Sequence, residues 1–256
     1  MRYRPLGTDP HDPRLGRFLP DDFEHLDRYP LTALAATDRP TQVPVVIGVN
    51  WYQEMDTPTL GSDGYWIARD GRLTRIRGGH AVCLEPGGNP DLTGWWEFYN
   101  QIREGACVGM AWSRAMSILN RVRYSGRWHW DRCKELDQWR ETNPGDNNGT
   151  SVRAGGEVLI RLGHVPWSPR LANGDGSHIA RAGYVPRATA GIHTFRWARS
   201  VDDIHAVLGN VRADKLGAIS ILNSWGKSWP RRVWLPDSVM DRLLREQGEA
   251  AVPTDR

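Results

Sequence analysis

Cysteine is scarce in this chain of 256 residues, which contains only Cys83, Cys107 and Cys133. Three cysteines without a C-x-x-C pair form no even disulfide set, so the pattern favours a reducing compartment or a free reactive thiol. No run of 18 apolar residues is present, so no membrane-spanning helix is expected. The first residues lack the apolar core of a signal peptide, and we therefore expect none.

Lysine and net charge are low as well. Only three of the 33 basic residues are lysines, and the formal net charge is +3. A charge this small gives no indication of a nucleic-acid partner, although arginine-rich surfaces suit many anionic partners. Tryptophan, in contrast, occurs 13 times. We expect Trp51, Trp95, Trp96 and Trp167 either to line a groove or to pack in a core.

The distribution of proline divides the chain into two parts. Seven prolines fall in the first 44 residues, with few periodic apolar positions between them, which predicts an extended N-terminal arm over residues 1–42. Residues 43–256 are expected to form one α+β domain, in which a mainly helical part (91–210) is flanked by β-rich segments (43–90 and 211–256). Strands are predicted at 45–52, 81–84, 218–222 and 233–235, and helices at 107–122, 150–162, 200–209 and 238–247.

Cys107 lies at the start of a predicted apolar helix, after a loop that contains Gly105. The partial positive charge at a helix N-terminus stabilises a thiolate, lowers the pKa of the thiol and so produces a nucleophile. Gln101 lies six residues upstream, placed to direct an amide N–H at the oxyanion that forms when a thiolate attacks a carbonyl group. The backbone N–H of Cys107 would be the second donor. The alternative is a buried cysteine that packs as a small hydrophobic residue.

His80 begins one predicted strand and Asn223 follows another. If strands 81–84 and 218–222 pair antiparallel, the start of the first lies beside the end of the second. Asn223 would then bond one ring nitrogen of His80, the other nitrogen would face Cys107, and Trp225 would shield the bond from water. A nucleophile, a base and an orienting amide in this arrangement are typical of a thiol hydrolase. Taken singly, each residue is equally compatible with a structural position.

Four short motifs resemble those of the papain-like cysteine peptidases. That family carries a glutamine six residues before the catalytic cysteine, an H-A-V strand start and an N-S-W-G-x-x-W segment. The matching features here are Gln101, Cys107, residues 80–82 and residues 223–229. Residues 147–153, which read N-N-G-T-S-V-R, also resemble a helix start found in many bacterial members.

The resemblance covers nearly all of the chain after the arm but changes the order of the motifs. The family order is Cys, His, Asn, whereas this chain runs His80, Cys107, Asn223. We therefore expect a papain-like fold with circularly permuted connectivity, in which a helical subdomain with a central Cys-bearing helix packs on an antiparallel sheet or barrel. Two positions depart from the family pattern: Val108 replaces a tryptophan, and Pro230 replaces a glycine.

The resemblance implies a cysteine-nucleophile hydrolase that cleaves peptide or related amide bonds through a thioester, without a metal or cofactor. In this assignment Cys107 attacks and His80 serves as base and then as acid. Asn223 orients the imidazole and Gln101 binds the oxyanion. Activity would require the Cys107 thiolate and protonated His80, which gives a bell-shaped pH profile. The residues expected to contact the peptide or protein substrate are Gly79, Gly105 and Trp225.

Other interpretations stay open. The same fold could serve as a structural or binding module, such as a phage virion component, so the expected location is cytoplasmic or virion-associated. A transferase could use the same acyl-enzyme. A zinc site could draw on His80 and Cys83, but an offset of three in a strand points their side chains to opposite faces. It could also draw on His129 and Cys133, which suit one helix face, but no second pair accompanies them. His205 is the reserve base if His80 proves inert.

Overall fold

The structure is a computed structural model, and it describes residues 42–62, 64–68, 73–87, 99–137, 149–168, 171 and 187–254. The predicted arm, apart from residue 42, lies outside these residues, and so do Trp95 and Trp96. The described chain is mixed α+β, with an eight-stranded open sheet and helices. This confirms the α+β class that the sequence predicts.

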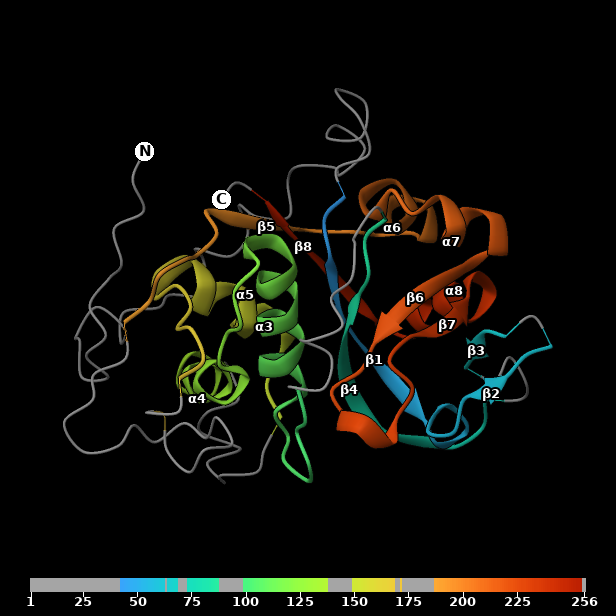
Figure 1. Cartoon of the computed structure of the whole chain (residues 1–256), viewed down its shortest axis with the longest axis horizontal. Coiled ribbons are helices and arrows are strands. Elements are labelled where there is room, and N and C mark those ends of the chain that lie inside the picture. Colours follow the sequence, from blue (N-terminus) through green and yellow to red (C-terminus); the bar gives the residue numbers. More distant parts are fainter. Residues whose placement is uncertain are drawn as a thin grey trace.

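The centre of the sheet is formed by β1 (Val45–Tyr52) and β4 (Ile76–Leu84), which pair antiparallel (Figure 1). Among the described strands the order is β2-β3-β7-β6-β4-β1-β8-β5, and only β3 and β7 pair in parallel. The other strands are β2 (Thr59–Leu60), β3 (Trp66–Ile67), β5 (Thr194–Trp197), β6 (Ala218–Leu222), β7 (Val233–Pro236) and β8 (Glu249–Thr254).

Helices pack against both faces of the central strands. On one side lie α3 (Cys107–Asn120), α4 (Gly126–Leu136) and α5 (Val152–Arg161), and on the other lie α6 (Val201–Leu208), α7 (Val211–Leu216) and α8 (Asp237–Arg245) (Figure 1). Because side chains alternate between the faces of a strand, β4 contributes to both cores. Ala81 and Cys83 pack with residues of α3 and α5, whereas Val82 and Leu84 pack with residues of α6 and α8.

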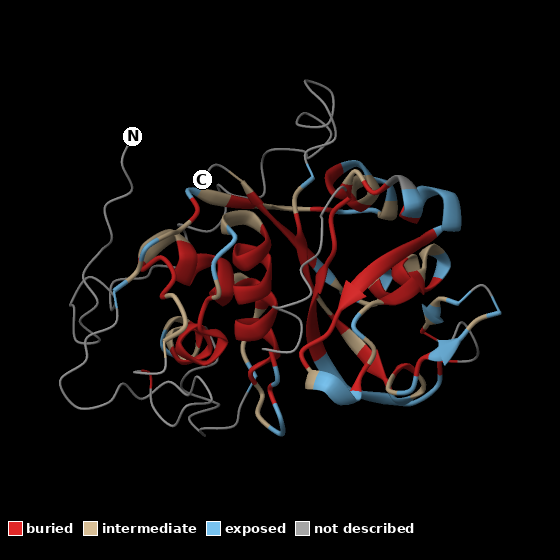
Figure 2. Ribbon diagram, in the orientation of Figure 1, coloured by how far each residue is buried: buried red, intermediate tan, exposed pale blue. Residues whose placement is uncertain are grey.

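Helix α3 is buried along most of its length, from Cys107 to Ile118 (Figure 2). It packs against β4 and β1 on one side and against α4 and α5 on the other. The helices approach closely because α3 carries a glycine at the contact: a Cβ at Gly109 would lie 2.4 Å from the carbonyl oxygen of Gly126. This packing holds the first turn of α3, which begins with Cys107, in a fixed position beside the sheet.

Most predicted elements have the expected positions. The predicted strands correspond to β1, β6, β7 and the second half of β4, and the predicted helices to α3, α5, α6 and α8. Ser151 is the N-cap of α5, and its hydroxyl accepts a hydrogen bond of 3.1 Å from the N–H of Ala154. Helix α3 ends two residues earlier than predicted, because Arg121 adopts a left-handed conformation with φ of 57°. The elements not predicted from the sequence include α4, α7, β5 and β8.

Candidate active site

The imidazole of His80 and the amide of Asn223 are joined by a hydrogen bond. The pairing of β4 with β6 is antiparallel, as expected, with Cys83 opposite Leu222. His80 Nε2 lies 2.8 Å from Asn223 Oδ1, and both side chains are buried. The same Oδ1 accepts a bond of 2.7 Å from the backbone N–H of Ser224. Because Oδ1 is an acceptor, Nε2 carries the proton, and Nδ1 is the ring nitrogen that can accept one.

Aromatic rings surround this hydrogen bond. The ring centroid of Trp225 lies 5.2 Å from that of His80, which fits the expected shielding role. Trp51 contacts the same imidazole edge-on, at a centroid distance of 4.8 Å. Trp51 is only 1% exposed, so it belongs to the core and does not line an open groove. The apolar enclosure strengthens the His80–Asn223 bond, because water has little access to compete for it.

Gln101 is held by Ser224, the residue that follows Asn223. Its side-chain Oε1 accepts a hydrogen bond of 2.6 Å from the Ser224 hydroxyl, and its backbone N–H donates to the Ser224 carbonyl at 2.8 Å. Its Nε2 donates to the carbonyl of Glu104 at 3.0 Å. With Oε1 occupied by a donor, the amide nitrogen is the end available to an oxyanion, and its second N–H is the group that could bind one.

Cys107 is the first residue of α3, and its sulfur lies beside β4. The backbone N–H groups of Ala81 and Val108 act to lower the pKa of its thiol, so both lie near the sulfur. Ala81 directly follows His80, so the thiol lies against the strand that carries the imidazole. Three segments that are remote in sequence are therefore brought together: the end of the 99–106 loop with α3, the middle of β4, and the residues after β6.

The charge state of the thiol differs from the expected one. Burial raises the pKa of Cys107, and the backbone N–H groups that oppose this effect do not outweigh it. The expectation that the helix N-terminus lowers the pKa of the thiol is therefore wrong, because the side chain is only 8% exposed. The sequence indicates the local dipole but not how deeply tertiary packing buries the sulfur.

Burial also shifts the pKa of the His80 imidazole, in the direction that favours its neutral form. Burial lowers the pKa of His80 to about 4, with a further lowering by the charge of Arg77, although the hydrogen bond to Asn223 opposes both. Between about pH 4 and the raised pKa of the thiol, the resting site therefore contains a neutral imidazole and a neutral thiol. A resting thiolate–imidazolium pair, as expected from the sequence, is not favoured in this structure.

The expected substrate-contacting glycines lie at different depths. Gly79 is exposed on β4, and a Cβ placed there would meet nothing within 4 Å. Gly105 is half-buried in the loop before Cys107, and its carbonyl oxygen lies 4.0 Å from the position of a Cβ at Gly149. The segment that leads into α5 thus borders the loop that leads into α3. Ile102 in that loop has a φ of 54°, which is strained for a β-branched residue.

The remaining candidates do not join this site. Burial raises the pKa of Cys83 to about 12 and that of Cys133 well above its usual value. Among the described residues no group of three metal-binding side chains is present. The ring of His205 lies 2.9 Å from a carboxylate oxygen of Asp214 and 2.9 Å from one of Asp237. These carboxylates join α6 to α7 and α8, so His205 has a structural role in this part of the fold.

Two contributors to the site were missed by sequence reasoning. Ser224 was seen only as part of a motif, although its position between Asn223 and Trp225 was a usable signal. Trp51 was seen as a groove or core residue, without its contact to His80. That contact depends on the register of β1 against β4, which pairs Val49 with His80 and which no local pattern specifies.

Comparisons with known proteins found no matching family model, no matching curated protein and no matching solved structure. The resemblance to papain-like peptidases therefore depends on the motifs and on the geometry of the site. Within the described residues, no helix is both long enough and apolar enough to cross a bilayer.

Proposed function

We propose that the protein is a thiol hydrolase that cleaves peptide or related amide bonds through a thioester. The observation that carries the proposal is the convergence of three remote segments on one place. His80 Nε2 bonds Asn223 at 2.8 Å, Ser224 holds the Gln101 amide at 2.6 Å, and the sulfur of Cys107 lies against the N–H of Ala81. These contacts support a site in which His80 is the base, Asn223 the orienting group, Gln101 an oxyanion donor and Cys107 the nucleophile.

The first half-reaction starts from the neutral pair. The sulfur of Cys107 attacks the amide carbonyl carbon while its proton passes to Nδ1 of His80, so no thiolate needs to exist beforehand. The carbonyl oxygen becomes an oxyanion, stabilised by the backbone N–H of Cys107 and by Nε2 of Gln101. The N–H of Cys107 belongs to the first turn of α3, where backbone N–H groups lack intrahelical partners. The C–N bond then breaks, and the leaving amine takes the proton from His80.

The second half-reaction regenerates the enzyme. Water attacks the thioester carbon and gives a proton to His80, and the same two donors bind the new oxyanion. The C–S bond breaks, a carboxylic acid leaves, and the sulfur recovers its proton from His80. Asn223 keeps the imidazole in one tautomer and orientation throughout, because its Oδ1 accepts the Nε2 proton.

The arrangement of the strands supports a papain-like fold with permuted connectivity. The residues that carry the His80–Asn223 bond are 143 positions apart in sequence, yet their strands β4 and β6 are neighbours in the sheet. The helices α3, α4 and α5 come from the chain between these strands and pack on one face of the sheet. Insertion of the helical part between two paired strands would change the order of the motifs but keep the site.

A non-catalytic role is the second candidate, because one observation favours it. The thiol of Cys107 is buried and its pKa is raised, as for a cysteine that serves only in packing. A papain-like fold retained as a structural or binding protein, for example in a virus particle, would have this property. The two proposals differ in whether Cys107 reacts with an electrophile that occupies the site.

The test is covalent labelling with an epoxysuccinyl peptide, located by mass spectrometry. We expect one adduct, on Cys107, and no adduct on Cys83 or Cys133. Cys83→Ser is the matched control and should label at the wild-type rate, whereas His80→Gln should label at least about tenfold more slowly because proton removal from sulfur is lost. Equal labelling of the wild type and His80→Gln would refute the catalytic assignment. Absence of labelling at Cys107 would favour the structural role.

A further inference from the structure

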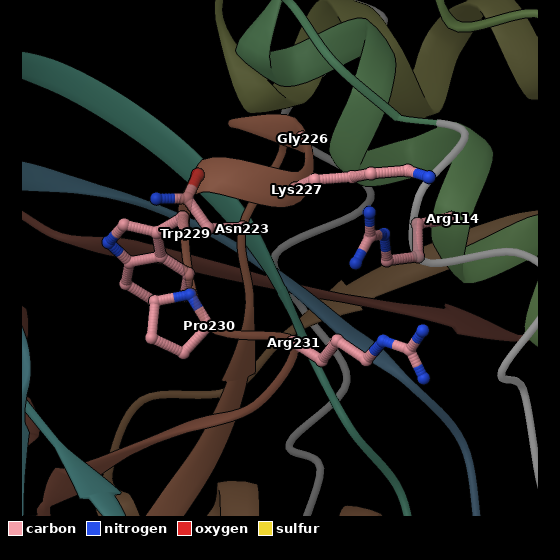
Figure 3. Close-up of a pocket in the computed structure, with 7 residues that line it drawn as sticks. All are labelled: Arg114, Asn223, Gly226, Lys227, Trp229, Pro230 and Arg231. Atoms are coloured by element: carbon pink, nitrogen blue, oxygen red, sulfur yellow. The ribbon is translucent and has the colours of Figure 1, made fainter.

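Helix α3 and the segment that follows β6 enclose a pocket with three cationic side chains (Figure 3). Arg114, Lys227 and Arg231 gather on one side of it, and Asn223, Trp229 and Pro230 lie on the other (Figure 3). Gly226 completes the described lining, which contains no acidic residue. Two of the cations, Lys227 and Arg231, are exposed.

Arg114 distinguishes this pocket from an ordinary basic surface. Its side chain is only 5% exposed, and its guanidinium lies 5.1 Å from the centre of the Tyr99 ring. The carboxylate of Glu85 acts on Arg114 and also accepts hydrogen bonds from Arg232 and from the Ser220 hydroxyl. The described lining of the pocket has three cationic side chains and no acidic one, so its charge is suited to an anionic group.

The pocket adjoins the candidate active site. Asn223 lines it and also bonds His80. Arg114 lies seven residues after Cys107, which places the two on the same side of α3 and about 10 Å apart along the helix axis. An extended peptide covers about 3.3 Å per residue, so this spacing corresponds to about three residues.

We infer that this pocket binds a carboxylate of the substrate, carried by an acidic peptide about three residues from the bond that Cys107 attacks. The inference rests on the proposed function, because it assigns the substrate class of the same site. Lys227 and Arg231 provide charge at the mouth of the pocket, and Arg114 provides a guanidinium in its wall. A planar guanidinium pairs with both oxygens of a carboxylate, which a neutral amide cannot reproduce.

The test measures binding by calorimetry to the full chain with Cys107→Ala, which prevents turnover. Three tetra-alanine probes are compared: succinyl-peptide amide, acetyl-peptide free acid, and the neutral acetyl-peptide amide. We expect at least one of the two carboxylate probes to bind at least about fivefold more tightly than the neutral probe. The probe that does so shows on which side of the reacting bond the anion lies. Added NaCl should reduce this difference, because the charges at the pocket mouth are exposed.

Variants at the pocket mouth provide the second arm. Lys227→Gln with Arg231→Gln should abolish the preference for the carboxylate probe. Lys215→Gln is the matched control, since it removes one exposed charge on α7, outside the pocket, and it should keep the preference. Equal affinity for all three probes, no binding at millimolar concentration, or a preference that survives in the double variant would overturn the inference.

The binding test is independent of catalysis. A protein that labels at Cys107 but has no carboxylate preference keeps the proposed function and loses this inference. A protein that binds the carboxylate probe but fails to label loses the proposed function, and the pocket is then an anion site of a binding protein. If the double variant does not fold, the salt dependence of the wild-type preference decides the matter, because a preference insensitive to salt contradicts the inference.

Discussion

Replacing Ser224 with alanine removes the hydroxyl that donates to Gln101 Oε1 at 2.6 Å. Ser224 is 4% exposed and Gln101 is 9% exposed, so water does not readily replace the lost donor. A buried acceptor left without a partner costs about 1–3 kcal/mol. Part of this cost is relieved when the amide of Gln101 rotates or shifts, and such a movement displaces Nε2 from the oxyanion.

The expected kinetic effect has an upper limit. Loss of one oxyanion donor lowers kcat by about 100-fold to 1000-fold, which is the expectation for Gln101→Ala. Ser224→Ala keeps the amide but loosens it, so we expect a decrease in kcat of about tenfold. The decrease should be in kcat more than in KM, because the oxyanion exists only in the transition state and the intermediates.

The assay is hydrolysis of a fluorogenic peptide amide by the two single variants, the double variant and the wild type. If Ser224 acts through Gln101, the double variant should be no slower than Gln101→Ala alone. Ser228→Ala is the matched control: this exposed hydroxyl in the same segment donates to the carbonyl of Trp225, at 3.1 Å, and its removal should leave kcat unchanged. Fully additive effects of Ser224→Ala and Gln101→Ala would refute the reasoning, and so would a kcat for Ser224→Ala equal to that of Ser228→Ala.

Two further predictions concern stability. Gly109→Ala should lower the free energy of unfolding in urea by about 1–3 kcal/mol or more, because its Cβ would overlap the Gly126 carbonyl. Gly79→Ala, where a Cβ meets nothing, should change it by less than about 0.5 kcal/mol. The pKa of folded His80, about 4, is below its unfolded value of 6.5, so the unfolded state binds more protons between these values and stability falls as pH decreases through this window. Lowering the pKa of the imidazole from 6.5 to about 4 corresponds to about 3 kcal/mol. Between pH 7 and pH 4 the wild type should therefore lose about 3 kcal/mol more stability than His80→Gln. An identical pH dependence of the urea midpoint in both proteins would contradict the assignment of the buried neutral imidazole.

Elements with a strong local pattern could be predicted from the sequence. The strand β1 reads V-V-I-G-V-N-W-Y, and helices α5 and α6 begin at the serine caps Ser151 and Ser200. The missed helix α4 has a serine cap too, but its buried residues include Arg127, His129 and Asp131, so no apolar stripe marks its inner face. The missed strand β8 contains a proline and two alanines, which have low strand propensity, and it is stabilised by pairing with β1 and β5.

The same division applies to the site. His80 and Asn223 lie close together because they flank two strands that pair antiparallel. The proximity of these two residues could therefore be predicted from the sequence. The protonation of the site depends on how deeply α3 is packed between the sheet, α4 and α5, and this is a property of the whole fold. The dipole of one helix end could therefore be read from the chain, but the larger effect of burial on Cys107 could not.

The neutral resting pair also bears on selectivity for substrate. A thiol whose pKa is raised by burial reacts slowly with small electrophiles in solution, because little thiolate is present. The proposed reaction would avoid that limit, because in it proton transfer to His80 accompanies attack on a carbonyl whose developing charge is met by the Cys107 N–H and Gln101. The driving force for deprotonation is then the oxyanion itself, which forms only when a substrate is bound. Burial of the Cys107 thiol, which opposes the effect expected from the helix dipole, would then restrict its reactivity to groups that reach the oxyanion donors.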